Sequence, residues 1–82
     1  MAEAEKLLSR MRNNPRDGWK IDDFKALAER YGIDWRQPGT SHVTFSRAGF
    51  EPVVVPAHKP VKPLYVTRFL ALIDKIGEHH GE

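Results

Sequence analysis

The spacing of apolar residues changes twice along the 82-residue chain. In the first part they recur every three or four positions, which is the pattern of one face of a helix. Two such faces occur, first at Ala4, Leu7, Leu8 and Met11, and then at Phe24, Leu27, Ala28 and Tyr31. The breakers in NNPRDG, residues 13–18, separate the two predicted helices. Gly32 stands where the left-handed residue that ends a helix is expected.

From residue 33 the period falls to two, which indicates strands. The predicted strands are 33–36, 41–47 and 51–55, joined by tight turns at 37–40 and 48–50. In the middle strand Val43 and Phe45 point to one side, whereas His42, Thr44 and Ser46 point to the other. Pro52 cannot donate to a ladder, so we expect it at the start of its strand or on an edge.

The helical period returns after the proline-rich loop 56–62. Pro63 suits the first turn of a helix and Gly77 suits its end. Its apolar face is formed by Val66, Phe69, Leu70 and Ile73. The pattern therefore predicts an α+β fold with a three-stranded antiparallel sheet, helices on one face and an extra N-terminal helix. His42 would lie on the face without helices.

Composition narrows the class of protein. Hydrophobic residues form 40% of the chain and charged residues 29%, as in a single globular domain. The absence of cysteine excludes disulfides and thiolate metal sites. The acidic N-terminal residues do not resemble a secretory signal, and no apolar run reaches the roughly 20 residues that span a bilayer. We expect a cytoplasmic protein without a membrane partner.

Positive charge is concentrated in the middle of the chain. Residues 34–70 contain five Lys and Arg against two Asp and Glu, and this segment includes His42. Such an excess favours a polyanionic partner, although a solvated surface would have the same composition.

His42 is the first candidate for chemistry. A free imidazole titrates near pH 6.5, so it both accepts and donates protons at neutral pH. On a rigid strand it could abstract the proton of a ribose 2′-hydroxyl. The alternative, an ordinary exposed strand residue, stays open because one histidine does not specify a reaction.

The proline-rich loop offers further cationic candidates. His58, Lys59 and Lys62 could contact phosphates if the prolines stiffen the loop, or they could simply be solvated. His79 and His80 are adjacent and lack the spacing of a zinc site, so no metal is expected. No nucleotide-cofactor motif occurs either, so no cofactor is expected. Trp35 and Tyr65 are expected to pack against the core.

Three motifs occur in a characteristic order: Ser41-His42 at a strand start, VVVPAHKPVKP at 53–63, and YVTRFLALID at 65–74. Over residues 20–76 this order resembles the HicA (YcfA-like) toxins of bacterial toxin–antitoxin systems. The chain departs from the common G-S-H-H pattern, because it reads Thr40-Ser41-His42-Val43. Residues 1–19 extend beyond the minimal family unit, and 78–82 would form a polar tail after the 20–77 domain.

The resemblance implies an α-β-β-β-α fold like that of double-stranded-RNA-binding domains. It also implies a metal-independent mRNA endonuclease with His42 as the catalytic residue. A HicB-like antitoxin would neutralise the enzyme in a hetero-oligomer, whereas the free toxin would be monomeric.

In this hypothesis Lys59 and Lys62 hold the phosphate, with Arg47 and His58 as further RNA contacts. Ser41 or Thr44 would orient the imidazole or contact the ribose. Two other functions remain open, a non-catalytic RNA-binding module and a protein-interaction domain.

Overall fold

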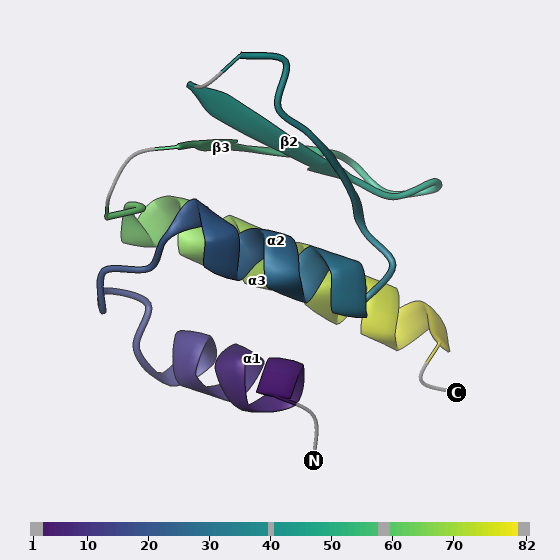
Figure 1. Ribbon diagram of the computed structural model, residues 1–82. Coiled ribbons are helices and arrows are strands. Elements are labelled where there is room, and N and C mark those ends of the chain that lie inside the picture. The colour runs from purple at the N-terminus through teal and green to yellow at the C-terminus, as the bar shows by residue number, and fades with distance from the viewer. Residues whose placement is uncertain (1–2, 40, 58–59, 81–82) are drawn as a thin grey trace.

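The computed structural model describes residues 3–39, 41–57 and 60–80. Its elements follow the predicted order of two helices, three strands and a helix (Figure 1). They are α1 (Glu3–Asn13), α2 (Ile21–Arg30), β1 (Asp34–Arg36), β2 (His42–Ser46), β3 (Val53–Pro56) and α3 (Pro63–His80). The predicted α+β class is therefore confirmed for the described residues.

The elements form three layers. The sheet lies on one side of the α2–α3 pair, and α1 lies on the other side, against both helices (Figure 1). The sheet thus has helices on one face only, as the alternation in the middle strand predicts. The N-terminal extension, whose role the sequence leaves open, packs on the domain.

The sheet is antiparallel in the order β1-β2-β3, so β2 is the central strand. Its register aligns residues of the helix-free face in rows across the strands. One row contains Arg36, Thr44 and Val54, and the next pairs His42 with Pro56. Because β3 pairs only with β2, Pro52 and Pro56 lie at the edge of the sheet, as expected for prolines beside a strand.

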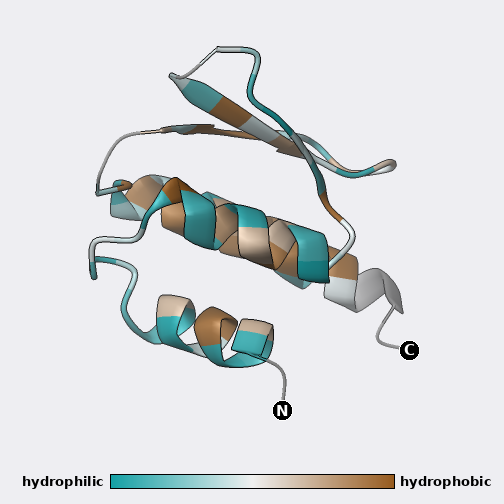
Figure 2. Ribbon diagram, viewed as in Figure 1, coloured by the Kyte–Doolittle hydropathy of each residue, from teal (hydrophilic) through white to brown (hydrophobic). Residues whose placement is uncertain are grey.

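Three phenylalanines join the sheet to the helices. Phe24 from α2, Phe45 from β2 and Phe69 from α3 are completely buried. The ring of Phe69 lies 4.9 Å from each of the other two, and the rings of Phe24 and Phe45 are 6.1 Å apart. These separations are typical of favourable tilted aromatic contacts. Figure 2 shows hydrophobic and hydrophilic positions following one another along β2, in line with the alternating burial of its residues.

The N-terminal helix is anchored by one buried side chain and two surface ion pairs. Met11 is completely buried against the domain. Arg12 donates two hydrogen bonds to the Asp74 carboxylate, one of 3.1 Å, and Arg30 lies 3.5 Å from Glu5. The hydrogen bond to Asp74 raises the pKa of Arg12. Exposed ion pairs of this kind contribute at most about 1 kcal/mol, so burial of Met11 is the main anchor.

The ends of one helix and of all three strands differ from the predicted bounds; β2 is one residue shorter than 41–47 at each end. Helix α3 does not end at Gly77 but continues to His80, so 78–80 are helical. One glycine costs a helix only about 1 kcal/mol, and no proline follows to stop it. Strand β1 is shorter than 33–36, because the Ile33 N–H bonds the Ala28 carbonyl at the end of α2. Strand β3 is displaced from 51–55 and includes Pro56.

Replacing Met11 by Ala should lower the free energy of unfolding by about 2–5 kcal/mol, because truncation leaves a cavity under α1. Urea unfolding followed by circular dichroism measures this change. Lys6→Ala, on an exposed position of the same helix, is the matched control and should stay within about 0.5 kcal/mol of the original protein. If Met11→Ala were as stable as the control, α1 would not be docked as described.

Candidate functional site around His42

His42 begins the central strand and is exposed on the helix-free face. The predicted alternation is confirmed, since Val43 and Phe45 are fully buried while Thr44 and Ser46 are half-buried. No described residue forms a hydrogen bond with the imidazole of His42. The predicted orienting bond from Ser41 or Thr44 is therefore not formed, and the ring is open to a ligand.

The backbone beside His42 is fixed by the neighbouring strand. The amide of Ala57 donates a 2.7 Å hydrogen bond to the carbonyl of Ser41. This bond extends the ladder one step beyond the His42–Pro56 pair. Ser41 is exposed, so its hydroxyl is accessible next to His42.

The loop that follows β3 returns to the helix layer near the N-terminal end of α3. The amide of Val61 donates a 2.9 Å hydrogen bond to the carbonyl of Trp19, and the Val61 side chain is buried. Lys62, directly before α3, has an exposed side chain. Figure 1 shows that the start of β2, the end of β3 and the start of α3 lie at the same end of the molecule. Predicted contacts His58 and Lys59, and also Thr40, lie outside the described residues.

Arg36 is a cation near His42 that the sequence-based site did not include. It pairs with Thr44 across the sheet and shares the helix-free face with it. Since His42 is two residues from Thr44, Arg36 and His42 are diagonal cross-strand neighbours, which places their backbones about 7–8 Å apart. The exposed arginine side chain is long enough to cover that distance. The alternation used for β2 would have revealed Arg36 if it had been extended to β1, where Trp35 faces inward.

Arg47 does not join this group. It follows β2, at the opposite end of the strand from His42, and about 16 Å of strand separates the two positions. Its guanidinium donates a 2.8 Å hydrogen bond to the Tyr31 carbonyl at the end of α2. Gly32 adopts the predicted left-handed conformation (φ +70°), and a Cβ there would lie 2.9 Å from the Arg47 guanidinium. Arg47 therefore lies at the α2–β1 junction, far along the strand from His42, and its contact with RNA stays a prediction.

A second cluster supports the turn that leads into β2. The ammonium group of Lys25 lies 4.3 Å from the Trp35 ring centroid and donates a 2.7 Å hydrogen bond to the Gln37 side chain. Trp35 packs partly buried against the core, as predicted, and so does Tyr65. Because Gln37 begins the turn between β1 and β2, Lys25 links that turn to α2.

The described residues provide neither a metal-binding cluster nor a membrane-spanning helix. They contain no group of three or more His, Cys, Asp or Glu side chains that could hold a metal ion. None of their helices is both long and apolar enough to cross a membrane.

Comparison of the chain with protein-family models, with curated proteins and with solved structures gives no match. The resemblance to HicA toxins therefore rests on the sequence motifs alone.

The positions of the two arginines predict effects of different size on stability. Arg47→Met should lower the free energy of unfolding by about 1–3 kcal/mol, because the Tyr31 carbonyl loses a charged, partly buried donor. Arg36→Met, on the exposed face, should change it by less than about 0.5 kcal/mol. Urea unfolding of both variants measures the difference. If Arg36→Met were the more destabilising variant, Arg36 and not Arg47 would be the arginine that stabilises the fold.

Proposed function

We propose that this protein is an RNA endonuclease of the HicA type, a toxin that cleaves mRNA with His42 as its catalytic residue. The observation that supports this best is the exposure of His42 on the helix-free face, with Arg36 diagonally opposite. An exposed sheet face of this kind admits a polymer, and the cation provides a contact for its phosphates. The order of the HicA-like motifs points to the same residue independently.

The reaction that fits one histidine and no metal is attack of the ribose 2′-hydroxyl on the adjacent phosphorus. Neutral His42 takes the proton of the 2′-hydroxyl as the 2′-oxygen–phosphorus bond forms. The bond from phosphorus to the 5′-oxygen breaks, and that oxygen takes a proton from water. The products are a 2′,3′-cyclic phosphate and a 5′-hydroxyl end. If His42 is the acid instead, protonated His42 donates a proton to the leaving 5′-oxygen, and water accepts the proton of the 2′-hydroxyl.

Cations around His42 would offset the charge that develops on the phosphate oxygens. Arg36 is the described cation that shares the helix-free face with His42, and Lys62 lies at the same end of the molecule. Lys59 and His58 are proposed contacts from the same loop as Lys62. Ser41 and Thr44 would contact the ribose. As in the family that the motifs resemble, the partner would be a HicB-like antitoxin in the cytoplasm, and the free toxin would be monomeric.

A second candidate is a module that binds RNA without cutting it. The absence of a hydrogen-bonding partner for His42 among the described residues favours this alternative, because proton transfer benefits from an oriented imidazole. Strand scission by the purified protein separates the two functions, since both predict salt-dependent binding of RNA.

His42→Ala should abolish RNA cleavage, with a loss of about 10²–10⁴-fold in rate, because it removes the proton-transfer group. Induced expression should then no longer arrest growth or degrade transcripts. Ser46→Ala, which changes another residue on the same face of β2, serves as control and should retain most of the cleavage. A folded His42→Ala variant that still degraded transcripts would exclude the proposed mechanism.

The pH dependence of cleavage tests the direction of proton transfer. If His42 is the base, kcat/KM for a short RNA should rise with pH, because a base must be unprotonated to accept the 2′-hydroxyl proton. Cleavage rates measured between pH 5 and pH 9 show whether kcat/KM rises. A rate that falls over the same range would assign His42 as the acid, and a flat profile would remove it from proton transfer.

A further inference from the structure

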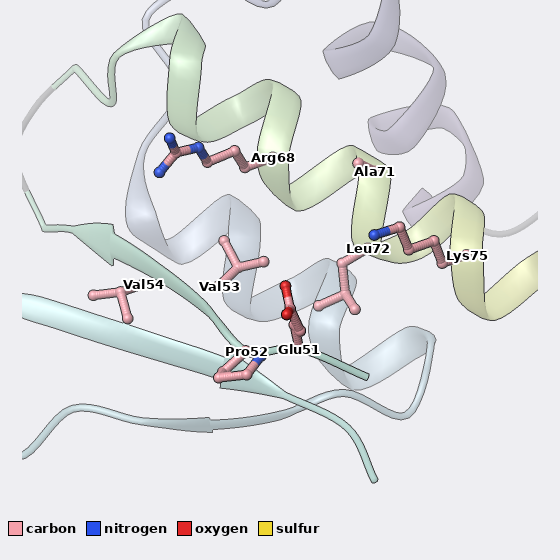
Figure 3. A pocket seen from close by; sticks show the side chains of 8 residues that line it. All are labelled: Glu51, Pro52, Val53, Val54, Arg68, Ala71, Leu72 and Lys75. Carbon is pink, nitrogen blue, oxygen red and sulfur yellow. The ribbon is translucent and has the colours of Figure 1, made fainter. Parts of the chain in front are cut away.

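A groove separates strand β3 from helix α3 on the side of the molecule away from β1. Its volume is about 460 Å³, and its lining consists of Glu51, Pro52, Val53, Val54, Arg68, Ala71, Leu72 and Lys75. Figure 3 shows Arg68 and Lys75 extending from α3 beside the strand, with Glu51 pointing toward the helix from the strand side. The groove is a mixed surface, with an apolar floor and charged walls.

The strand wall of the groove has an unusual set of backbone groups. The hydrogen bond from the Ala57 amide to the Ser41 carbonyl, together with the register, shows which residues face β2. Residues 53, 55 and 57 direct their N–H and C=O groups toward β2. Residues 52, 54 and 56 therefore direct theirs outward, away from β2. Two of these three are prolines and have no N–H. The outer edge thus presents three carbonyl oxygens but a single donor, at Val54.

This edge cannot accept another β-strand in a continuous ladder, because an added strand needs donors and acceptors in alternation. A ligand that fits the edge must bring its own hydrogen-bond donors to the carbonyls. Strand addition, a common way to bind peptides at a sheet edge, is therefore excluded here.

The helix wall selects for negative charge. Arg68 and Lys75 are seven residues apart, which places them on one helix face about 10.5 Å apart along the axis. Both are exposed, and neither forms an ion pair with another described residue. Against the single carboxylate of Glu51, they leave the groove with an excess of positive charge.

Phosphates and hydroxyl donors occur together in an RNA strand, whose 2′-hydroxyls can donate to carbonyls. The strand wall of the groove ends at Val54, two residues before Pro56, and Pro56 is the residue paired with His42. We propose that the β3–α3 groove binds a single-stranded segment of RNA that extends from the cleavage point at His42. Arg68 and Lys75 contact its phosphates. This inference rests on the proposed function, because it extends the same substrate beyond His42.

The double variant Arg68→Gln/Lys75→Gln tests the groove. Binding is measured with a labelled single-stranded RNA of mixed sequence in the His42→Ala background, so that the probe stays intact. Each phosphate contact on a single strand adds about 0.7 to the slope of log affinity against log salt concentration. Loss of two contacts should reduce the magnitude of the slope by about 1.4. When the salt concentration is raised from 50 to 200 mM, the affinity of the reference protein should therefore fall about sevenfold more than the affinity of the variant.

The matched control removes two exposed cations outside the groove, Lys6 of α1 and Arg16 of the 14–18 turn. Lys6→Gln/Arg16→Gln has the same net charge as the groove variant and should keep the full slope. With His42 restored, the groove variant should raise KM for a long RNA and leave kcat within about twofold. Single-stranded DNA of the same sequence, which lacks 2′-hydroxyl donors, should bind the reference protein more weakly than RNA does.

Equal slopes for the groove variant and the control would overturn the inference, and so would equal binding of DNA and RNA. If the groove variant kept its RNA slope but lost affinity for a protein partner, the groove would be a protein-binding surface instead. These outcomes differ from failure of the proposed function, which would appear as cleavage that persists in His42→Ala or as no cleavage by the intact enzyme.

Discussion

Contact among Phe24, Phe45 and Phe69 is the interaction on which the rest of the structure depends. Each ring comes from a different element, so the cluster fixes α2, α3 and the central strand relative to one another. Tilted aromatic pairs add about 0.5–1.5 kcal/mol each beyond the burial of their surface. In a chain of 82 residues, where little surface is buried in total, this is a large share of the net stability. Phe45 in turn determines which face of β2 is inward, and so places His42 outward.

The sequence predicted those parts of the fold that depend on local periodicity. All three helices and all three strands were expected, and so was the outward position of His42. Exact ends were harder, because they depend on tertiary contacts. The helix continues past Gly77 because nothing stops it, and β1 begins late because Ile33 bonds back to α2. Neither of these effects has a local signature in the sequence.

The candidate site, like the fold, could be predicted from the sequence only in part. Four of the predicted site residues are exposed or partly exposed at or near one end of the sheet, namely His42, Ser41, Thr44 and Lys62. Arg36 was missed because its proximity to His42 follows from the register of β1 with β2, which the sequence does not specify. For Arg47 the structure shows a framework contact that the sequence did not indicate. Its charge suggested a phosphate contact, but the left-handed turn at Gly32 leaves the Tyr31 carbonyl in need of a donor, and Arg47 supplies it.

The two prolines on the outer edge of β3 also limit how copies of this chain can associate. Open-ended stacking of sheets requires both edge strands to accept a neighbour, as in fibrils. Since the outer edge of β3 cannot continue a ladder, strand pairing between copies is confined to the β1 edge. Pairing through that edge would join two copies and stop, since each would present its proline-bearing edge outward. Pro52 and Pro56 therefore protect the molecule against polymerisation at high concentration, independently of any ligand that the groove binds.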